Sequence, residues 1–419
     1  MLSKDKLKQI LVEQRERLLK VPLGVEREVL SIIEKKRKLP HIVVITGLRR
    51  CGKSTLLRQI IKKFYSDTDF YYINFEDERL FNFKSQDFND IYEVLVELFS
   101  KKKTFFLDEV QNIKNFELFV RRFYDEGFKF FITGSNAELL SKELGTKLTG
   151  RHVDINLTPF SFREFLKFKK VEFDTLDIYK TEFKARIKNN FKDYLNFGGM
   201  PEYLIFDDIE ILERIYEDII MRDVVVRHNV ENIFELKTLY SYLITNFSKK
   251  FSFNSVKNAI SLSSVNTIKK YISYFEETYF LSVINKFDYS AKKILRSEKK
   301  VYVLDSGFIK ALSTSITKDK GWLLENLVFN VLNNKFKVYY YSNGTECDFL
   351  IVKNKSIESA IQVTWELNGN KKREFDGLYD TMEKFNIKTG LILTFDQEET
   401  IRKEGKKIEI KPVWKWLLT

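Results

Sequence analysis

The segment Gly47-Leu48-Arg49-Arg50-Cys51-Gly52-Lys53-Ser54 is the most informative part of this sequence about its fold. It fits the pattern G-x-x-x-x-G-K-[ST], in which glycines let backbone N–H groups turn inward and wrap the phosphates of a nucleotide. We expect an apolar strand just before it, over residues 42–46, and an amphipathic helix just after it, over residues 54–65. A helix that starts here points its positive end at the phosphates. The stretch therefore predicts a P-loop that binds ATP together with Mg²⁺.

Two side chains of this loop have expected roles. Lys53 would reach the β- and γ-phosphates, and Ser54 would ligate Mg²⁺. A glycine turn that precedes a helix by chance is the alternative, but the strand, the lysine and the serine together argue against it. The residues expected to surround the nucleotide are Gly47, Leu48, Arg49, Arg50, Cys51, Gly52, Lys53, Ser54 and Thr55.

A second motif, Thr104-Phe105-Phe106-Leu107-Asp108-Glu109, follows about fifty residues later. A hydrophobic strand that ends in Asp-Glu is the Walker B pattern. Asp108 would hold Mg²⁺ through water, and Glu109 could orient and deprotonate the attacking water. Acidic residues end many strands without any function, but after a P-loop the catalytic interpretation is favoured.

Short apolar strands alternate with helical patterns through the first part of the chain. Strands are expected over residues 42–46, 70–75, 104–108, 129–133 and 152–157, and helices over 54–65 and 90–99. This alternation predicts an α/β fold with a parallel sheet that helices cover on both faces. The strand over 70–75 separates the two motifs in sequence, which suits the P-loop branch with another strand inserted between the two Walker strands.

Several segments together resemble a widespread family of archaeal and bacterial AAA+-type ATPases with a C-terminal domain of unknown function. They are Gly47–Ser54, residues 106–111, 133–136 and 143–151, and Gly198-Gly199-Met200-Pro201-Glu202. The resemblance covers most of the chain and is most specific between residues 45 and 201. It implies an ATPase core, a helical lid, a winged helix and a degenerate restriction-endonuclease-like domain, and it leaves the client open.

Three further candidates complete the expected ATPase site. A polar side chain after the fourth strand, Ser135 or Asn136, could touch the γ-phosphate or the lytic water, or could cap the next helix instead. Arg151 precedes the fifth strand, where an AAA+ arginine commonly reaches the γ-phosphate of a neighbouring subunit. Arg151 might instead pair with a carboxylate on its own surface. Arg49 and Arg50 are alternatives that could act in cis.

Downstream of the core, residues 159–229 are expected to be mainly helical, with a tight turn at residues 198–201. Residues 236–308 then give helix, helix, turn, helix and two strands, which matches a winged helix-turn-helix. The basic or amide side chains expected to contact DNA phosphates are Asn266, Lys269 and Lys270 on the third helix, and Lys286, Lys292, Lys293, Arg296, Lys299 and Lys300 on the hairpin. A protein–protein module with a solvated basic loop is the alternative.

The last part of the chain resembles the PD-(D/E)xK nuclease core. Asp348 stands where the first acidic ligand would be, Glu325 where a helix acid often assists, and Gln362-Val363-Thr364 where (Glu/Gln)-x-Lys is expected. Threonine cannot supply the charge of the lysine, and a neutral Gln362 is a weaker metal ligand than Glu. We therefore favour a degenerate domain, with Asp348 as a metal ligand only if the site is active. The predicted domains are residues 1–165, 166–235, 236–310 and 311–419.

Composition agrees with this organisation and leaves the partner open. The net charge of +12 favours a polyanionic partner such as nucleic acid, or it reflects Lys-rich surfaces in general. Two cysteines cannot build a disulfide framework, residues 1–17 lack a signal-like apolar region, and no stretch suits a membrane span. The cytoplasm is the expected compartment.

Three functions are compared. The main hypothesis is an ATP-hydrolysing AAA+ enzyme that couples nucleotide state to a C-terminal module binding double-stranded DNA. The second is a nucleotide-gated switch or scaffold that binds a protein client and turns ATP over slowly. The third, disfavoured by the missing lysine, is a metal-dependent nuclease. A homo-oligomer is required if Arg151 acts on a neighbouring subunit.

Overall fold

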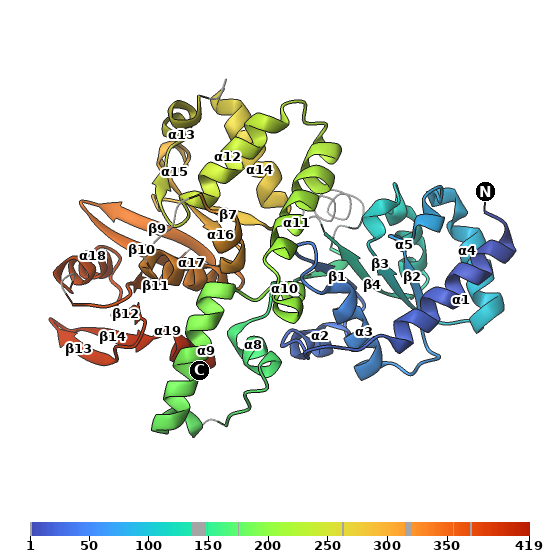
Figure 1. Ribbon diagram of the computed structural model, residues 1–419, viewed down its shortest axis with the longest axis horizontal. Helices are drawn as coiled ribbons and strands as arrows, with labels where there is room; N and C mark the ends of the chain where they lie inside the picture. Colours follow the sequence, from blue (N-terminus) through green and yellow to red (C-terminus); the bar gives the residue numbers. More distant parts are fainter. Residues whose placement is uncertain are drawn as a thin grey trace. The chain divides into compact units, whose positions relative to one another are not determined.

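The structure is a computed structural model that describes residues 2–135, 148, 150–174, 176–261, 264–314, 320–354, 356–368 and 371–419. The chain divides into two compact units, Met1–Pro159 and Phe160–Thr419 (Figure 1). No helix in the described part of the chain combines the length and the apolar character needed to cross a bilayer.

The first unit is built on a five-stranded sheet with the strand order β2-β3-β4-β1-β5. All neighbouring strands pair in parallel, as the alternating pattern predicts. Strand β4 lies between β1, which leads into the P-loop, and β3, which ends in Asp108. A strand thus lies between the two Walker strands, as expected, but it is β4, whereas the strand expected over residues 70–75 is β2 at the edge of the sheet. The strands are β1 (Ile42–Thr46), β2 (Tyr71–Asn74), β3 (Thr104–Asp108), β4 (Lys129–Gly134) and β5 (His152–Asn156).

Helices cover both faces of this sheet, and every residue of β1 and β3 is buried, most of them apolar. Along β3, Phe105 packs against Phe123 of α5, whereas Phe106 meets Tyr65, which follows α3, on the opposite face. The helices of this unit are α1 (Lys4–Lys20), α2 (Leu30–Lys36), α3 (Lys53–Phe64), α4 (Phe88–Phe99) and α5 (Phe116–Asp125), with 3-10 turns η1 (Glu78–Leu80), η2 (Ser85–Asp87) and η3 (Val110–Asn112).

The second unit begins with a mainly helical region, as expected for residues 159–229. Its elements are α8 (Phe162–Phe168), η5 (Asp177–Tyr179), α9 (Thr181–Phe197), α10 (Pro201–Phe206), α11 (Glu210–Asp218), the π-helix η6 (Ile219–Val226) and α12 (Ile233–Thr245). Because this unit and the first are separate bodies, its expected role as a lid stays a prediction.

The glycine turn between α9 and α10 is tied to a carboxylate far away in sequence. Gly199 N donates to Asp305 Oδ2 at 2.6 Å, and Gly307 N donates to Asp305 Oδ1 at 2.9 Å. Gly198 has φ +74°, and a Cβ there would lie 1.9 Å from the same carboxylate. Burial raises the pKa of Asp305 to about 6. The turn was predicted from glycine and proline chemistry, but its long-range partner was not.

A three-stranded antiparallel sheet, ordered β6-β8-β7, follows. It comprises β6 (Lys250–Phe251), β7 (Leu281–Asn285) and β8 (Lys299–Val303), and it accompanies the helices α13 (Phe253–Ile260), α14 (Val265–Glu277), α15 (Ala291–Arg296) and α16 (Ser306–Leu312). The last two strands pair antiparallel, as the predicted hairpin requires, but the helix α15 stands between them in sequence. The prediction that Lys299 and Lys300 are phosphate contacts on this hairpin was wrong, because β8 is the central strand and both side chains are buried.

The chain ends in a six-stranded mixed sheet with the order β13-β14-β12-β11-β10-β9. The antiparallel run β9-β10-β11 continues into the parallel pairs β11-β12 and β12-β14. Its strands are β9 (Lys337–Asn343), β10 (Thr345–Lys353), β11 (Ser356–Val363), β12 (Thr389–Thr394), β13 (Glu399–Lys403) and β14 (Lys406–Pro412), and its helices are α17 (Lys320–Asn333), α18 (Lys371–Lys384) and α19 (Val413–Leu418).

Candidate functional site

The P-loop has the backbone conformation that its glycines make possible. Gly47 has φ +147°, and a Cβ at this position would lie 2.1 Å from the Leu157 carbonyl oxygen. Gly52 adopts the left-handed conformation at φ +99° and forms the N-cap of α3 without any side-chain cap. The first N–H groups of α3 are thus left without a capping side chain, which is the arrangement that binds anions.

Lys53, at the start of α3, is buried beneath the loop. Its Nζ donates to the carbonyl oxygens of Gly47 at 3.2 Å and Leu48 at 3.3 Å. The same ammonium lies 3.4 Å from Glu109 Oε1. Burial would lower the pKa of Lys53, but the Glu109 carboxylate and its neighbours outweigh burial and raise it. Lys53 therefore stays charged and directly links the two Walker motifs.

Asp108, at the end of β3, is fully buried and hydrogen-bonded on both oxygens. Tyr72 Oη donates to Oδ2 at 3.1 Å, and Thr133 Oγ1 donates to Oδ1 at 2.5 Å. Burial and the charge of Glu109 raise the pKa of Asp108, against the hydrogen bonds from Thr133, Ser54 and Tyr72. Ser54, the other predicted Mg²⁺ ligand, thus lies close enough to Asp108 to act on the pKa of its carboxyl group.

Glu109 follows in the left-handed conformation, φ +51°, which turns its side chain away from the line of the strand. Its backbone N–H donates to Thr133 Oγ1 at 2.8 Å, and Gln111 Nε2 donates to its carboxylate. Burial opposes ionisation, but Lys53, Gln111 and Arg49 together lower the pKa of Glu109. The group is therefore an ionised carboxylate, as a general base must be.

Three side chains of this site were missed from sequence. Thr133 contacts both acidic residues, Tyr72 holds Asp108, and Gln111 bridges Glu109 and Ser135. Thr133 could have been noticed as a hydroxyl at the end of an apolar strand. Ser135, one of the two sensor candidates, is buried with its Oγ 3.4 Å from Gln111 Nε2. The other candidate, Asn136, lies outside the described residues.

The predicted arginines are paired within the first unit. Arg151 Nη2 lies 3.3 Å from Asp125 Oδ1, which matches the alternative of an ion pair on its own surface. Arg49 Nη1 lies 3.7 Å from Glu76 Oε1, and Arg50 has φ +63° within the loop. The role of Arg151 as a finger stays a prediction.

The buried Arg27 side chain binds the backbone of the P-loop and of the segment that follows β5. Arg27 Nη1 donates to the Cys51 carbonyl at 2.9 Å, and Arg27 Nη2 donates to the Thr158 carbonyl at 2.5 Å. The Cys51 thiol is also buried, with Sγ 3.3 Å from the Leu157 carbonyl oxygen, and burial raises its pKa. Cys51 therefore contributes its backbone to the loop while its thiol packs beneath it.

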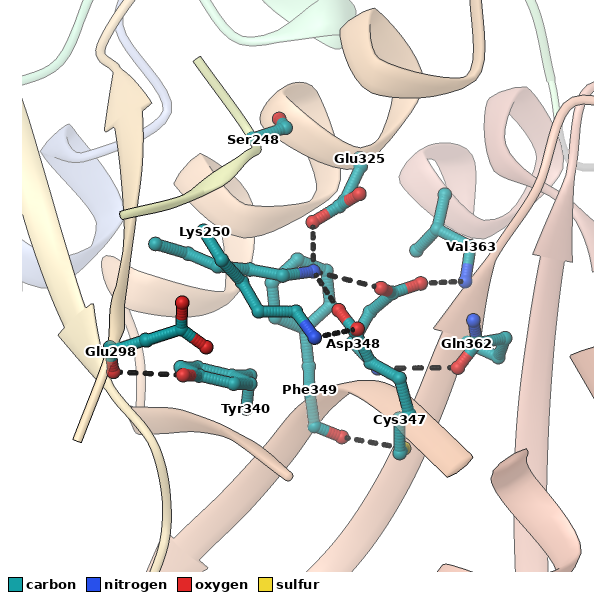
Figure 2. Close-up of polar contacts among 12 residues, drawn as sticks. Ser248, Lys250, Glu298, Glu325, Tyr340, Cys347, Asp348, Phe349, Gln362 and Val363 are labelled. Carbon is teal, nitrogen blue, oxygen red and sulfur yellow. Dashed lines mark hydrogen bonds and ion pairs between the residues drawn. The ribbon is translucent and has the colours of Figure 1, made fainter. Parts of the chain in front are cut away.

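The second unit contains a separate polar pocket of about 1290 Å³. Glu325 of α17, Asp348 of β10 and Gln362 of β11 line it and face one another (Figure 2). These are the three residues that the nuclease resemblance singled out. Side chains from three different elements thus line one pocket, and a nuclease-like role for them stays a prediction.

Lys300 of β8 reaches the centre of this group. Its Nζ donates to Glu325 Oε1 at 2.9 Å and to Asp348 Oδ1 at 3.1 Å, and lies 2.8 Å from Glu346 Oε1. Its side chain is only 4% exposed, and the surrounding carboxylates overcome burial and raise its pKa. Burial and Asp348 raise the pKa of Glu325 to about 8. Lys300 therefore cannot serve as the exposed phosphate contact that its place in a basic run suggested.

The amide and hydroxyl groups at the lysine-motif position have protein partners. Gln362 Oε1 accepts from Asp348 N at 3.2 Å, and Gln362 Nε2 donates to Glu374 Oε2 at 2.6 Å. Thr364 Oγ1 donates to the Glu366 carbonyl at 3.1 Å. Across the described ranges of the chain, no group of three or more His, Cys, Asp or Glu side chains is arranged to hold a metal ion.

The remaining basic candidates are mostly on the surface. Exposed side chains on or beside α14 and α15 are Asn266, Lys269, Lys270, Lys292, Lys293 and Arg296, and Lys286 is half-buried. Lys299 is buried, and its Nζ donates to the carbonyl oxygens of Ile294 at 3.1 Å and Ser297 at 3.0 Å. Lys299 thus binds backbone carbonyl groups at the C-terminal end of α15 rather than facing solvent.

Comparison with known proteins gives two matching families and several relatives. Residues 39–166 match the family described as "AAA domain", and residues 188–320 match "Domain of unknown function (DUF8612)". The "Uncharacterized protein MJ1544" of Methanocaldococcus jannaschii is 40% identical over 405 residues, which cover 90% of this chain and 88% of that protein. An "Uncharacterized protein" of Haemophilus influenzae is 29% identical over 392 residues, covering 90% of this chain and 94% of the relative.

Solved structures are more distant. The Aeropyrum pernix ORC1 protein in complex with DNA is 10% identical, covers 76% of this chain and 98% of its own, and has a TM-score of 0.31. The Aeropyrum pernix ORC2 protein in its ADP form is 12% identical, covers 64% and 90%, and has a TM-score of 0.30. TM-scores this low do not establish that these proteins and this chain share a fold.

Proposed function

This chain belongs to the same family as the Methanocaldococcus jannaschii protein MJ1544 and contains an AAA domain, and from that premise we propose that it binds ATP with Mg²⁺ and hydrolyses it. The observation that supports this most is the ion pair of Lys53 with Glu109, 3.4 Å apart, and Ser54 lies near enough to Asp108 to lower the pKa of that carboxyl group. These pairs join the Walker A and Walker B residues into one site.

In the proposed reaction, Lys53 and the first N–H groups of α3 bind the β- and γ-phosphates. Ser54 and Asp108 would hold Mg²⁺, which neutralises phosphate charge when bound. The γ-phosphate draws the Lys53 ammonium away from Glu109, so that the carboxylate becomes free to accept a proton from water. The water oxygen then bonds to the γ-phosphorus. The bond between the γ-phosphorus and the bridging oxygen breaks at the same time, which gives ADP and phosphate.

We further propose that nucleotide state is coupled to binding of double-stranded DNA by the second unit. The helices α13 and α14 with the strands β7 and β8 follow the order of a winged helix. Lys269 and Lys270 on α14, and Lys292, Lys293 and Arg296 on α15, are exposed. Counterion release from DNA requires basic contacts of this kind.

Steady-state ATP hydrolysis, with and without double-stranded DNA at low and moderate salt, tests this coupling. Stimulation that fades as salt rises is expected, since phosphate contacts weaken with salt. Lys269→Ala/Lys270→Ala should reduce the stimulation severalfold. Arg402→Ala/Lys403→Ala, which removes the same charge from exposed positions on β13, should leave it unchanged. Hydrolysis that is indifferent to DNA under all conditions would contradict the coupling.

A second candidate is a nucleotide-gated switch that binds a protein partner. Large apolar side chains are exposed along α10 to α12, including Phe206 at 66%, Val226 at 74% and Phe234 at 81%. A contiguous patch of exposed apolar side chains often marks a protein-interaction site, so this candidate requires that these side chains lie together. A DNA-insensitive ATPase that binds a protein client only in one nucleotide state would favour this candidate.

We keep the proposal that Arg151 acts on a neighbouring subunit. Its ion pair with Asp125 is half-exposed and can exchange for a phosphate group, because surface pairs contribute only about 0–1 kcal/mol. Arg151→Ala should lower turnover while leaving ATP binding intact. Turnover of the unmodified chain should rise with protein concentration. Full activity of a dilute monomer would rule the finger out.

A further inference from the structure

The carboxylates of the C-terminal pocket converge on one ammonium group. Lys300 has three N–H donors, and its Nζ has three carboxylate oxygens within reach, those of Glu325 at 2.9 Å, Glu346 at 2.8 Å and Asp348 at 3.1 Å. Lys300 comes from the sheet β6-β8-β7, whereas the three acids come from α17 and β10. A charged group from one substructure is thus inserted into an acidic site built by another.

The other oxygens of this cluster are also largely engaged. Asp348 Oδ2 accepts from Val363 N at 3.0 Å, and Glu346 Oε2 lies 2.5 Å from the Lys250 ammonium. Tyr302 Oη donates to the same Glu325 oxygen that Lys300 contacts, at 2.7 Å. A metal ion could enter this cluster only by displacing the Lys300 ammonium, because that group occupies the point where the oxygens meet.

The size of the cluster matches an ammonium ion. The oxygens lie 2.8 to 3.1 Å from Lys300 Nζ. Mg²⁺ demands oxygens at about 2.0–2.1 Å in near-ideal octahedral geometry, whereas Ca²⁺ accepts about 2.3–2.6 Å and flexible geometry. The carboxylates would therefore have to move farther to ligate Mg²⁺ than to ligate Ca²⁺.

We propose that the Lys300 ammonium is the resident cation of this pocket, and that the carboxylates of Glu325, Glu346 and Asp348 form a latent divalent-cation site that opens only when the ammonium is removed. In the wild-type chain the ammonium groups of Lys300 and Lys250 already supply two positive charges to the three carboxylates. All residues that line this pocket belong to the second unit, whereas the Walker residues belong to the first. Cation binding in the pocket can therefore be tested whether or not the chain hydrolyses ATP.

Calorimetric titration of the full chain with CaCl₂ and MgCl₂, without nucleotide, tests this proposal. Lys300→Ala should bind one more Ca²⁺ per chain than the wild type, at least tenfold more tightly than Mg²⁺. The double variant Lys300→Ala/Asp348→Asn should lose that additional site. Subtracting the wild-type titration removes any divalent binding at the P-loop. Ca²⁺ should also raise the Tm of Lys300→Ala more than that of the wild type.

Two results would overturn the proposal. The first is a Ca²⁺ or Mg²⁺ site in the wild-type chain that Asp348→Asn abolishes, because the ammonium would then not exclude metal. The second is a folded Lys300→Ala chain, verified by circular dichroism, with no additional site. If Lys300→Ala does not fold, Lys300→Gln takes its place, and the comparison of wild type with Asp348→Asn still decides the first point.

Discussion

Replacing Glu109 with Gln is expected to lower kcat for ATP hydrolysis by about 10²–10⁴-fold while ATP binding is retained. The amide has nearly the same shape as the carboxylate but cannot accept the proton of the attacking water. It also cannot form the ion pair with Lys53, which in the unmodified chain is 3.4 Å long. Lys53 is then freer to bind phosphate, so nucleotide affinity should be equal to that of the wild type or higher.

Phosphate release and binding of a fluorescent ATP analogue, measured on the same samples, separate the two effects. Lys53→Ala should weaken binding, in contrast to Glu109→Gln. Glu126→Gln changes an exposed carboxylate in the same unit and should match the wild type in both assays. If Glu109→Gln turned ATP over at close to the wild-type rate, another group would have to be the base.

Replacing Lys300 with Met is expected to reduce the free energy of unfolding of the second unit by about 3–5 kcal/mol, the usual effect of removing one partner from a buried ion pair. Methionine fills a similar volume, so the loss reports charge rather than a cavity. The buried carboxylates of Glu325 and Asp348 would lose their ammonium partner, and Lys250 would be left with only the partly exposed Glu346.

Urea unfolding followed by tryptophan fluorescence measures this loss selectively. All four tryptophans, Trp322, Trp365, Trp414 and Trp416, belong to the second unit. Lys292→Met, at an exposed position on α15, should change stability by less than about 0.5 kcal/mol. Lys300→Met/Glu325→Gln should recover part of the lost stability, because the effects of substitutions at contacting residues are not additive. If Lys300→Met lowered the free energy of unfolding by less than about 1 kcal/mol, the three carboxylates would not need the Lys300 ammonium for stability.

The two Walker motifs could be predicted because nucleotide chemistry requires a fixed local order of residues. Lys53, Ser54, Asp108 and Glu109 were identified from such order, and the structure brings them together. The contacts of Tyr72 and Thr133 with Asp108 could not be found in this way. They depend on the spatial strand order β2-β3-β4-β1-β5, and local periodicity carries no information about which strands become neighbours. Gln111 is only two residues from Glu109, but it lies outside the Walker B pattern.

Lys299 and Lys300 were predicted to be exposed phosphate contacts, but both side chains are buried. They stand in a run of basic residues that includes Lys292, Lys293 and Arg296, and a basic run usually marks a solvated surface. Burial of a lysine depends on acceptors supplied from elsewhere. For Lys300, Glu325 and Asp348 lie 25 and 48 residues farther along the chain. Only the folded arrangement of α17 and β10 reveals them.

The arginine beneath the P-loop bears on how nucleotide is recognised. Arg27 joins the Cys51 carbonyl to the Thr158 carbonyl, and the Cys51 thiol is fixed against Leu157. These bonds are made within the protein, so they hold the shape of the loop without a bound nucleotide. A receptor that is already shaped loses little conformational entropy on association. Discrimination among nucleotides then falls to groups outside the loop, since a preformed phosphate cradle accepts any triphosphate equally well.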